Sequence, residues 1–284
     1  MLMIANSEKY RDLSPHQMVP KLADKGLYVA SESSFYRLLR AEKLMAHRSK
    51  SKPKTNHSPR SLVAACSNQV WSWDITYLHS RIKGKYYYLY MVEDIFSRYI
   101  VGWCIKEMEC SDLASLLIEQ CCITQSIQRQ QIHLHSDNGS PMKGATLQAT
   151  LERLGVTPSF SRPRVSNDNP YSESLFKTLK YCPYYPAKAF ATIQDAQEWV
   201  KAFTHWYNTE HLHSEICFVT PHARHYGLEN KILHKRDILY KISRNINPLR
   251  WSRDTRNWNP APEVILNPGK EKKRQKEAMK SQLA

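Results

Sequence analysis

The stretch Val70-Trp71-Ser72-Trp73-Asp74-Ile75-Thr76-Tyr77 decides the fold. Its aromatic and β-branched side chains predict a buried strand over about residues 70–78. Asp74 interrupts this apolar run, and a carboxylate buried without a partner is costly. The sequence therefore predicts a specific partner for Asp74, although aspartate at the end of a strand can also be simple turn chemistry.

The segments after this strand predict an α/β fold. Three successive strands joined by short turns predict antiparallel pairing, and the alternation of helices and strands after them predicts a mixed sheet with helices on both faces. The expected strands are 70–78, 85–92, 98–105, 131–135 and 156–160, and the expected helices are 111–126 and 143–154.

Two further carboxylates stand at the ends of expected elements. Asp137 follows the strand at 131–135, and Glu173 lies in the first turn of a helix that Asn169 caps and Pro170 begins. Ligands usually bind at sheet ends in such architectures, and three separated carboxylates suit Mg²⁺ or Mn²⁺ in a two-metal phosphoryl-transfer site. The structural alternatives are a turn at Asp137 and a favourable helix-dipole position for Glu173.

The spacing of these carboxylates is distinctive, because 35 residues separate Asp137 from Glu173. This spacing, together with the flanking sequence motifs at 135–141 and 167–174, resembles the D,D(35)E signature of bacterial insertion-sequence transposases and retroviral integrases. The chain is most similar to the downstream-frame transposase of two-frame insertion sequences. The resemblance spans roughly residues 10–260.

The resemblance implies a ribonuclease-H-like catalytic core. Asp74, Asp137 and Glu173 are then the catalytic residues and the ligands of two Mg²⁺ (or Mn²⁺) ions. They cut DNA at the ends of a mobile element and join the new 3′-hydroxyl to target DNA. The implied partners are the terminal repeats and target DNA, further copies of the chain on that DNA, and an upstream-frame product that supplies an additional DNA-binding segment.

Basic residues near Glu173 are candidate phosphate ligands. Lys177 and Lys180 follow Glu173 by four and seven residues, so a helix places them on the same face. The resemblance implies that Lys180 contacts DNA near the reacting phosphate. Arg162 and Arg164 precede this helix and either bind phosphates or belong to a solvated loop.

The N-terminal segment predicts two short helices. Ser14 and Pro15 predict a helix start, Gly26 predicts the end of that helix, and a second helix is expected from about residue 33. This arrangement resembles a helix-turn-helix, in which Arg37 and Arg40 would contact DNA. Helix pairs of this size also occur for purely structural reasons.

Charge supports a nucleic-acid partner. The net charge is +15, distributed as +7 over residues 1–69, +1 over 70–184 and +7 over 185–284. Basic flanks around a balanced centre are expected where flanking segments hold a polyanion. The predicted organisation is a helix-turn-helix-like module at 1–46, a basic linker at 47–69, a catalytic core at 70–225 and a basic C-terminal extension at 226–284.

Other features exclude several function classes. An apolar run of membrane-spanning length is absent and no secretory leader follows Met1, which favours a bacterial cytoplasmic, nucleoid-associated protein without a membrane partner. The seven cysteines have no zinc-site spacing, and no Walker-type loop implies ATP. Two alternatives remain: a ribonuclease-H-like nuclease that cuts without joining, and a DNA-binding repressor built on an inactive core.

Overall fold

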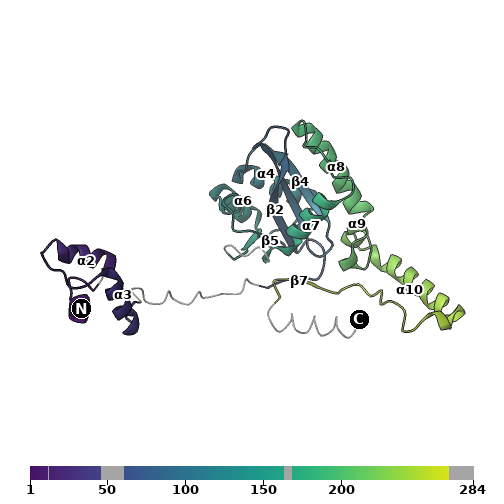
Figure 1. Ribbon diagram of the computed structural model, residues 1–284. Coiled ribbons are helices and arrows are strands. Elements are labelled where there is room, and N and C mark those ends of the chain that lie inside the picture. The colour runs from purple at the N-terminus through teal and green to yellow at the C-terminus, as the bar shows by residue number, and fades with distance from the viewer. Residues whose placement is uncertain (12, 46–60, 163–167, 269–284) are drawn as a thin grey trace. The chain divides into compact units, whose positions relative to one another are not determined.

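The computed structural model describes residues 1–11, 13–45, 61–162 and 168–268 (Figure 1). The chain divides into two compact units, Met1–His57 and Ser58–Ala284. We call them the N-terminal unit and the main unit. No helix among the described residues is both long enough and apolar enough to cross a bilayer.

The N-terminal unit is helical. Its helices are α1 (Leu2–Ala5), α2 (Pro15–Ala23) and α3 (Glu32–Ala41). The predicted start of α2 is confirmed, since Ser14 and Gln17 form a capping box in front of it. The buried side chains of α2 and α3 form one small core, which consists of Met18, Leu22, Phe35 and Leu39 together with Ala5 and Tyr10.

The main unit is built on a mixed five-stranded sheet with the order β4-β3-β2-β5-β6. The strand β2 pairs antiparallel with β3, β3 pairs antiparallel with β4, and β2-β5-β6 run parallel. This arrangement confirms the predicted ribonuclease-H-like fold class. The strands are β2 (Val70–His79), β3 (Tyr86–Asp94), β4 (Ile100–Lys106), β5 (His133–Ser136) and β6 (Thr157–Phe160).

Helices cover both faces of this sheet (Figure 1). Along β2, Trp71 and Trp73 pack with α4 and α6, whereas Leu78 packs with α7 and α8 on the opposite face. This alternation follows from the two-residue period of a strand. The helices of the main unit are α4 (Ser111–Thr124), α5 (Ser140–Lys143), α6 (Ala145–Leu154), α7 (Pro170–Tyr181), α8 (Ile193–Thr209), α9 (Pro221–His225) and α10 (Glu229–Ile246), with 3-10 turns at Ser214–Ile216 and Pro248–Arg250.

A second, two-stranded sheet was not predicted. It pairs β1 (Leu62–Ala64) antiparallel with β7 (Val264–Leu266). The strand β1 falls within the predicted linker, whose residues 47–60 lie outside the described residues. The predicted C-terminal extension therefore contributes a strand, which pairs with a segment that precedes the five-stranded sheet.

Candidate active site

Asp74 and Asp137 lie on neighbouring parallel strands. The register pairs Trp73 of β2 with Ser136, the last residue of β5. Asp74 and Asp137 are the next residues of the two chain segments, so their backbones leave this pair of strands next to each other. The strand β2 continues to His79, whereas β5 has ended. The sheet thus brings the first two predicted carboxylates to one edge.

The helix α7 brings Glu173 towards the same strand. Ser72 on β2 donates a hydrogen bond to Asn169 Oδ1 at 2.5 Å, and its hydroxyl lies 2.7 Å from the Ser172 hydroxyl. Asn169 Nδ2 also donates to the Trp73 carbonyl at 3.4 Å. Asn169 occupies the predicted N-cap position, but its side chain makes no capping hydrogen bond and ties α7 to β2 instead. Glu173 lies in the first turn of this helix, where its own side chain is exposed.

The three carboxylates share one electrostatic environment. Burial is the main cause that raises the pKa of Asp74 from the ordinary 3.8 to about 7; the charges of Asp137 and Glu173 add to this rise, and the Ile75 amide opposes it. That amide donates to Asp74 Oδ1 at 2.8 Å. Within the described residues, however, no three acidic, histidine or cysteine side chains are arranged closely enough to hold a metal ion. Asp74, Asp137 and Glu173 therefore influence one another electrostatically, but their side chains are not close enough together to coordinate one ion.

A buried histidine organises the segment around Asp137. Ser161 donates a hydrogen bond to Asp137 Oδ1 at 2.9 Å. His135 on β5 lies 3.0 Å from the Ser159 hydroxyl through Nδ1 and 2.9 Å from the Asp168 carbonyl through Nε2. Burial lowers the pKa of His135, which favours the neutral ring. This network was not predicted from the sequence, although the motif His135-Ser136-Asp137 places its histidine two residues before the carboxylate.

Glu109 is a fourth carboxylate near Asp74 that the sequence analysis did not select. Its charge contributes to the raised pKa of Asp74, and a hydrogen bond to Glu109 is the main cause that raises the pKa of Tyr77 to about 12. The Tyr90 hydroxyl fixes the loop on both sides of Glu109 by bonding the Met108 carbonyl and the Cys110 amide, each at 2.9 Å. No sequence spacing marks this residue, because the tertiary fold alone brings the loop to β2.

Arg162, predicted as a phosphate ligand, binds a carboxylate of its own chain. Its Nε and Nη2 atoms donate to the two oxygens of Asp168 at 2.8 and 2.9 Å, and its backbone amide adds a third bond at 2.9 Å. The Arg162 guanidinium is the main cause that lowers the pKa of Asp168. Its role in DNA contact stays a prediction. Arg164 lies outside the described residues.

The other predicted DNA-binding residues are exposed. Lys177 and Lys180 project from α7 on the surface that also presents Glu173. Arg37 and Arg40 are exposed on α3 of the N-terminal unit. Exposure leaves these four cations accessible to a polyanion, and their contact with DNA stays a prediction.

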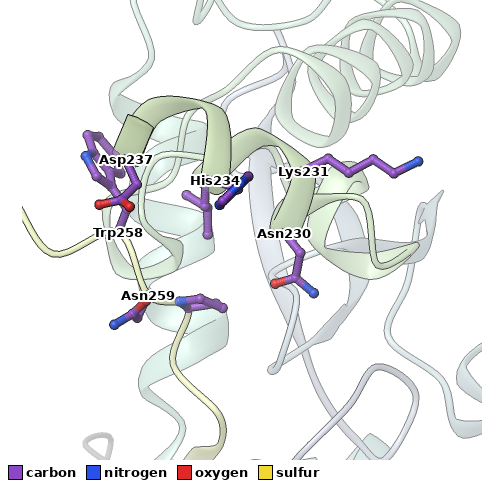
Figure 2. A pocket seen from close by; sticks show the side chains of 8 residues that line it. Asn230, Lys231, His234, Asp237, Trp258 and Asn259 are labelled. Carbon is purple, nitrogen blue, oxygen red and sulfur yellow. The ribbon is translucent and has the colours of Figure 1, made fainter. Parts of the chain in front are cut away.

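A separate hollow of about 480 Å³ lies between α10 and the segment that precedes β7 (Figure 2). None of the three predicted catalytic carboxylates lines it. Apolar Leu233, Trp258 and Pro260 line it together with polar or charged Asn230, Lys231, His234, Asp237 and Asn259.

Two family models, both described as the integrase core domain, match residues 64–166 and 154–221. Together they cover more than half of the 284-residue chain. The chain belongs to the integrase core family. The matched ranges contain β2, β5 and α7, and therefore the edge formed by Asp74, Asp137 and Glu173.

Curated relatives of this integrase core are transposases by name. The chain is 33% identical over 158 residues to the transposase for insertion sequence element IS904 of Lactococcus lactis, covering 56% of this chain and 61% of the relative. It is 32% identical over 121 residues to transposase InsF for insertion sequence IS3A of Escherichia coli K12, covering 43% and 41%. The predicted resemblance to insertion-sequence transposases is confirmed. The match spans less than two thirds of either relative.

Solved structures similar to the integrase core include two viral proteins. One is a cryo-EM structure of the simian T-cell lymphotropic virus intasome in complex with PP2A regulatory subunit B56 gamma, at 19% identity and a TM-score of 0.48, covering 75% of this chain and 74% of that chain. Another is the HTLV-2 integrase catalytic core domain in complex with magnesium, at 18% identity and a TM-score of 0.40, covering 56% and 97%. The fold class itself rests on the strand order and register described above.

Proposed function

We propose that this chain is a DDE transposase that cuts DNA at the ends of a mobile element and transfers the new 3′-ends into target DNA. The observation that carries the proposal is the shared edge of β2, β5 and α7, where Asp74, Asp137 and Glu173 come from segments far apart in sequence. The names of the curated relatives support the same activity.

The residues at this edge fit a divalent cation. Carboxylate oxygens are the donors that Mg²⁺ and Mn²⁺ prefer. The raised pKa of Asp74 indicates negative charge that burial and neighbouring carboxylates leave poorly compensated. Asn138, beside Asp137, also has a buried Oδ1 atom without a hydrogen-bond partner among the described residues. We infer that Asp74, Asp137 and Glu173 would hold one or two such ions.

The bound ions would supply activation of the attacking oxygen and stabilisation of charge on the attacked phosphate. The chain itself would position the ligands. Parallel strands fix the Asp74 and Asp137 backbones, Ser161 orients the Asp137 carboxylate, and the contacts of Ser72 hold the start of α7. Preorganisation of this kind is a large part of catalysis when no covalent intermediate is needed.

Basic side chains would hold the DNA. On α7, Lys177 and Lys180 share the exposed surface with Glu173 and can neutralise phosphates near the reacting bond. Arg37 and Arg40 would contact DNA from the N-terminal unit. Arg162 would keep the segment before α7 in place through Asp168 and could reach a phosphate only by sharing or leaving that pair.

The proposed partners are terminal-repeat DNA, target DNA, further copies of this chain on that DNA, and an upstream-frame product that supplies an additional DNA-binding segment. The proposed location is the bacterial cytoplasm, in association with the nucleoid. The proposed partners and the proposed location follow from the activity proposed above.

A strand-mapping assay tests this function. The chain, alone and fused to the upstream-frame product, is incubated with terminal-repeat DNA and Mg²⁺, and the products are resolved by strand. Cleavage at the element end followed by joining of the 3′-hydroxyl is expected, and Asp137→Asn should abolish both steps while DNA binding persists. Cleavage without joining of a pre-cut end would favour a nuclease, and binding without any cleavage would favour a repressor.

A further inference from the structure

The end of the described chain returns to the candidate active site. After α10 the chain runs back along residues 247–263 and forms β7 beside β1 (Figure 1). The register pairs Leu62 with Leu266 and Ala64 with Val264. A segment predicted as a basic extension therefore becomes part of the main unit at the base of α7.

The strand β7 packs against the helix that carries Glu173. Leu266 is fully buried in an apolar cluster that includes Tyr171. Tyr171 lies in the first turn of α7, two residues before Glu173. The other buried members of this cluster come from β1, β2 and the turn after β3, and they are Leu62, Ala64, Val70, Ile95 and Phe96.

Polar contacts fix the same junction. Asn267 Nδ2 donates a hydrogen bond of 3.1 Å to the Asp168 carbonyl, just before α7. The same Asp168 carbonyl also lies 2.9 Å from the Nε2 atom of His135, which belongs to β5. The Tyr171 hydroxyl lies 3.5 Å from the Ile265 carbonyl of β7. The residues directly before α7 are thus held between the strand that leads to Asp137 and the strand at the end of the described chain.

A third contact holds Tyr171 from the turn between β3 and β4. The guanidinium of Arg98 lies 4.2 Å from the centroid of the Tyr171 ring, within cation–π distance. The ring is 9% exposed, so it is nearly enclosed between this turn and β7. The first turn of α7 therefore has little freedom to shift along β2 unless β7 moves as well.

We propose that β7 and Asn267 position Glu173. The C-terminal segment would then be needed for the geometry of the active site. Asn267 and Tyr171 are positioning residues: they touch neither DNA nor metal but set where the first turn of α7 lies relative to Asp74 and Asp137. This inference rests on the proposed function. Because phosphoryl-transfer sites depend on placing ligands within a fraction of an ångström, a small displacement of α7 affects catalysis more than folding.

The substitution Asn267→Asp tests this positioning role. Asn267 has a positive φ of 52°, a conformation that aspartate also tolerates. The change replaces the Nδ2 donor by an oxygen that repels the Asp168 carbonyl. Asn257→Asp is the matched control, because Asn257 is exposed in the same returning segment. Tyr171→Phe is a milder second variant, which keeps the ring and removes the hydroxyl near Ile265.

The expected result is a fall of about tenfold or more in the strand-transfer rate for Asn267→Asp and a higher Mg²⁺ concentration for half-maximal activity. The Kd for DNA should stay within about twofold of the wild-type value, Tyr171→Phe should show a smaller loss of rate, and Asn257→Asp should show none. Equal rates and equal Mg²⁺ requirements in Asn267→Asp and Asn257→Asp would overturn the proposal.

Hydrogen exchange provides a readout that does not need activity. In Asn267→Asp the backbone amides of residues 173–177 should exchange faster than in Asn257→Asp, while those of β3 stay protected. Unchanged exchange in residues 173–177 would also overturn the positioning role. If the wild-type chain shows no strand transfer either alone or fused to the upstream-frame product, the proposed function fails, and the exchange experiment still decides whether β7 restrains α7.

Discussion

Asp94 and Asp74 lie on adjacent strands of one sheet but have contrasting surroundings. Asp94 is fully buried; its Oδ2 accepts bonds from the Ser97 amide at 2.9 Å and the Ser97 hydroxyl at 2.5 Å, and its Oδ1 accepts from the Asn68 amide at 3.0 Å. Asp74 accepts one bond from within the described part of the chain, from the Ile75 amide. Burial and neighbouring carboxylates then raise the pKa of Asp74 to about 7.

This difference is the one expected between a carboxylate that serves the fold and a carboxylate that serves chemistry, the role proposed for Asp74. A buried carboxylate is stabilised when the protein supplies donors to its oxygens, as it does for Asp94. For Asp74 the protein supplies further negative charge from Asp137 and Glu173 instead. A site arranged in this way is expected to lower stability and to gain function by binding a cation.

The largest effect is expected at Asp74. Asp74→Asn should reduce strand transfer by at least about a hundredfold, because a ligand that stabilises the transition state is lost. The metal-free variant should be no less stable than the wild type, since a poorly compensated charge is removed. Activity and urea unfolding are measured side by side, with the exposed Glu152→Gln as a control. Near wild-type activity, or a marked loss of stability, would place Asp74 in the same class as Asp94.

The reverse pattern is expected at Asp94. Asp94→Asn places an amide group against donors from Ser97 or Asn68, which should lower the free energy of unfolding by about 2–4 kcal/mol. The strand-transfer rate of the folded fraction should change little. Urea unfolding gives the stability, and activity measured well below the unfolding midpoint gives the rate. A variant that unfolds like the wild type would remove the structural role assigned to Asp94.

A smaller effect, on the pH dependence of the free energy of unfolding, is expected at Glu93. Burial raises its pKa from the ordinary 4.5 to about 8, although the charge of Arg98 lowers it, and its Oε2 has no partner among the described residues. The folded state therefore binds this proton more tightly than the unfolded state. The resulting stability is full below pH 4.5 and is lost as the pH rises through about 8.

Glu93→Gln should remove this dependence. Urea unfolding across that pH window should show a flatter curve for the variant than for the wild type, with the two diverging most at the alkaline end. The matched control is Glu152→Gln, which should keep the wild-type slope. Parallel curves for Glu93→Gln and the wild type would show that Arg98 keeps Glu93 ionised in the folded protein.

The smallest effect is expected at Lys180, which is exposed and is proposed as a DNA contact rather than as a metal ligand like Asp74 or a structural residue like Asp94. Lys180→Ala should leave the free energy of unfolding unchanged and reduce the slope of log K for DNA binding against log salt by about one. Lys188→Ala, also exposed but outside α7, is the control. Equal salt slopes for the two variants would remove Lys180 from the DNA-binding surface.

Local sequence signals predicted much of this fold. The apolar run at Trp71 and Trp73 predicted β2, and Pro170 at the first helical position predicted the start of α7, because both signals are local; the Asn169 side chain itself makes no capping hydrogen bond. The short strands β1 and β7 pair across about 200 residues and have no local signal. The pairing of Arg162 with Asp168 depends on the folded geometry in the same way, since the sequence shows only that both charges are present.

The sequence predicts which carboxylates belong to the candidate site, and that membership stays a prediction; it does not predict which residues hold these carboxylates in place. The spacing of Asp137 and Glu173 selects the carboxylates, whereas Ser72 and Asn267 are ordinary polar residues until the fold brings them to α7. Which residues can bind a metal follows from chemistry that the sequence displays. Which residues hold those ligands in place follows from tertiary contacts.

Binding of Mn²⁺ to the metal-free protein, measured by electron paramagnetic resonance, tests the central claim most directly. The wild-type chain should bind one or two Mn²⁺ ions, and Asp74→Asn, Asp137→Asn and Glu173→Gln should each weaken that binding by about tenfold or more, whereas Asp94→Asn should bind like the wild type. Mn²⁺ binding that is absent from the wild type, or that survives all three substitutions unchanged, would contradict a metal site at this edge of the sheet.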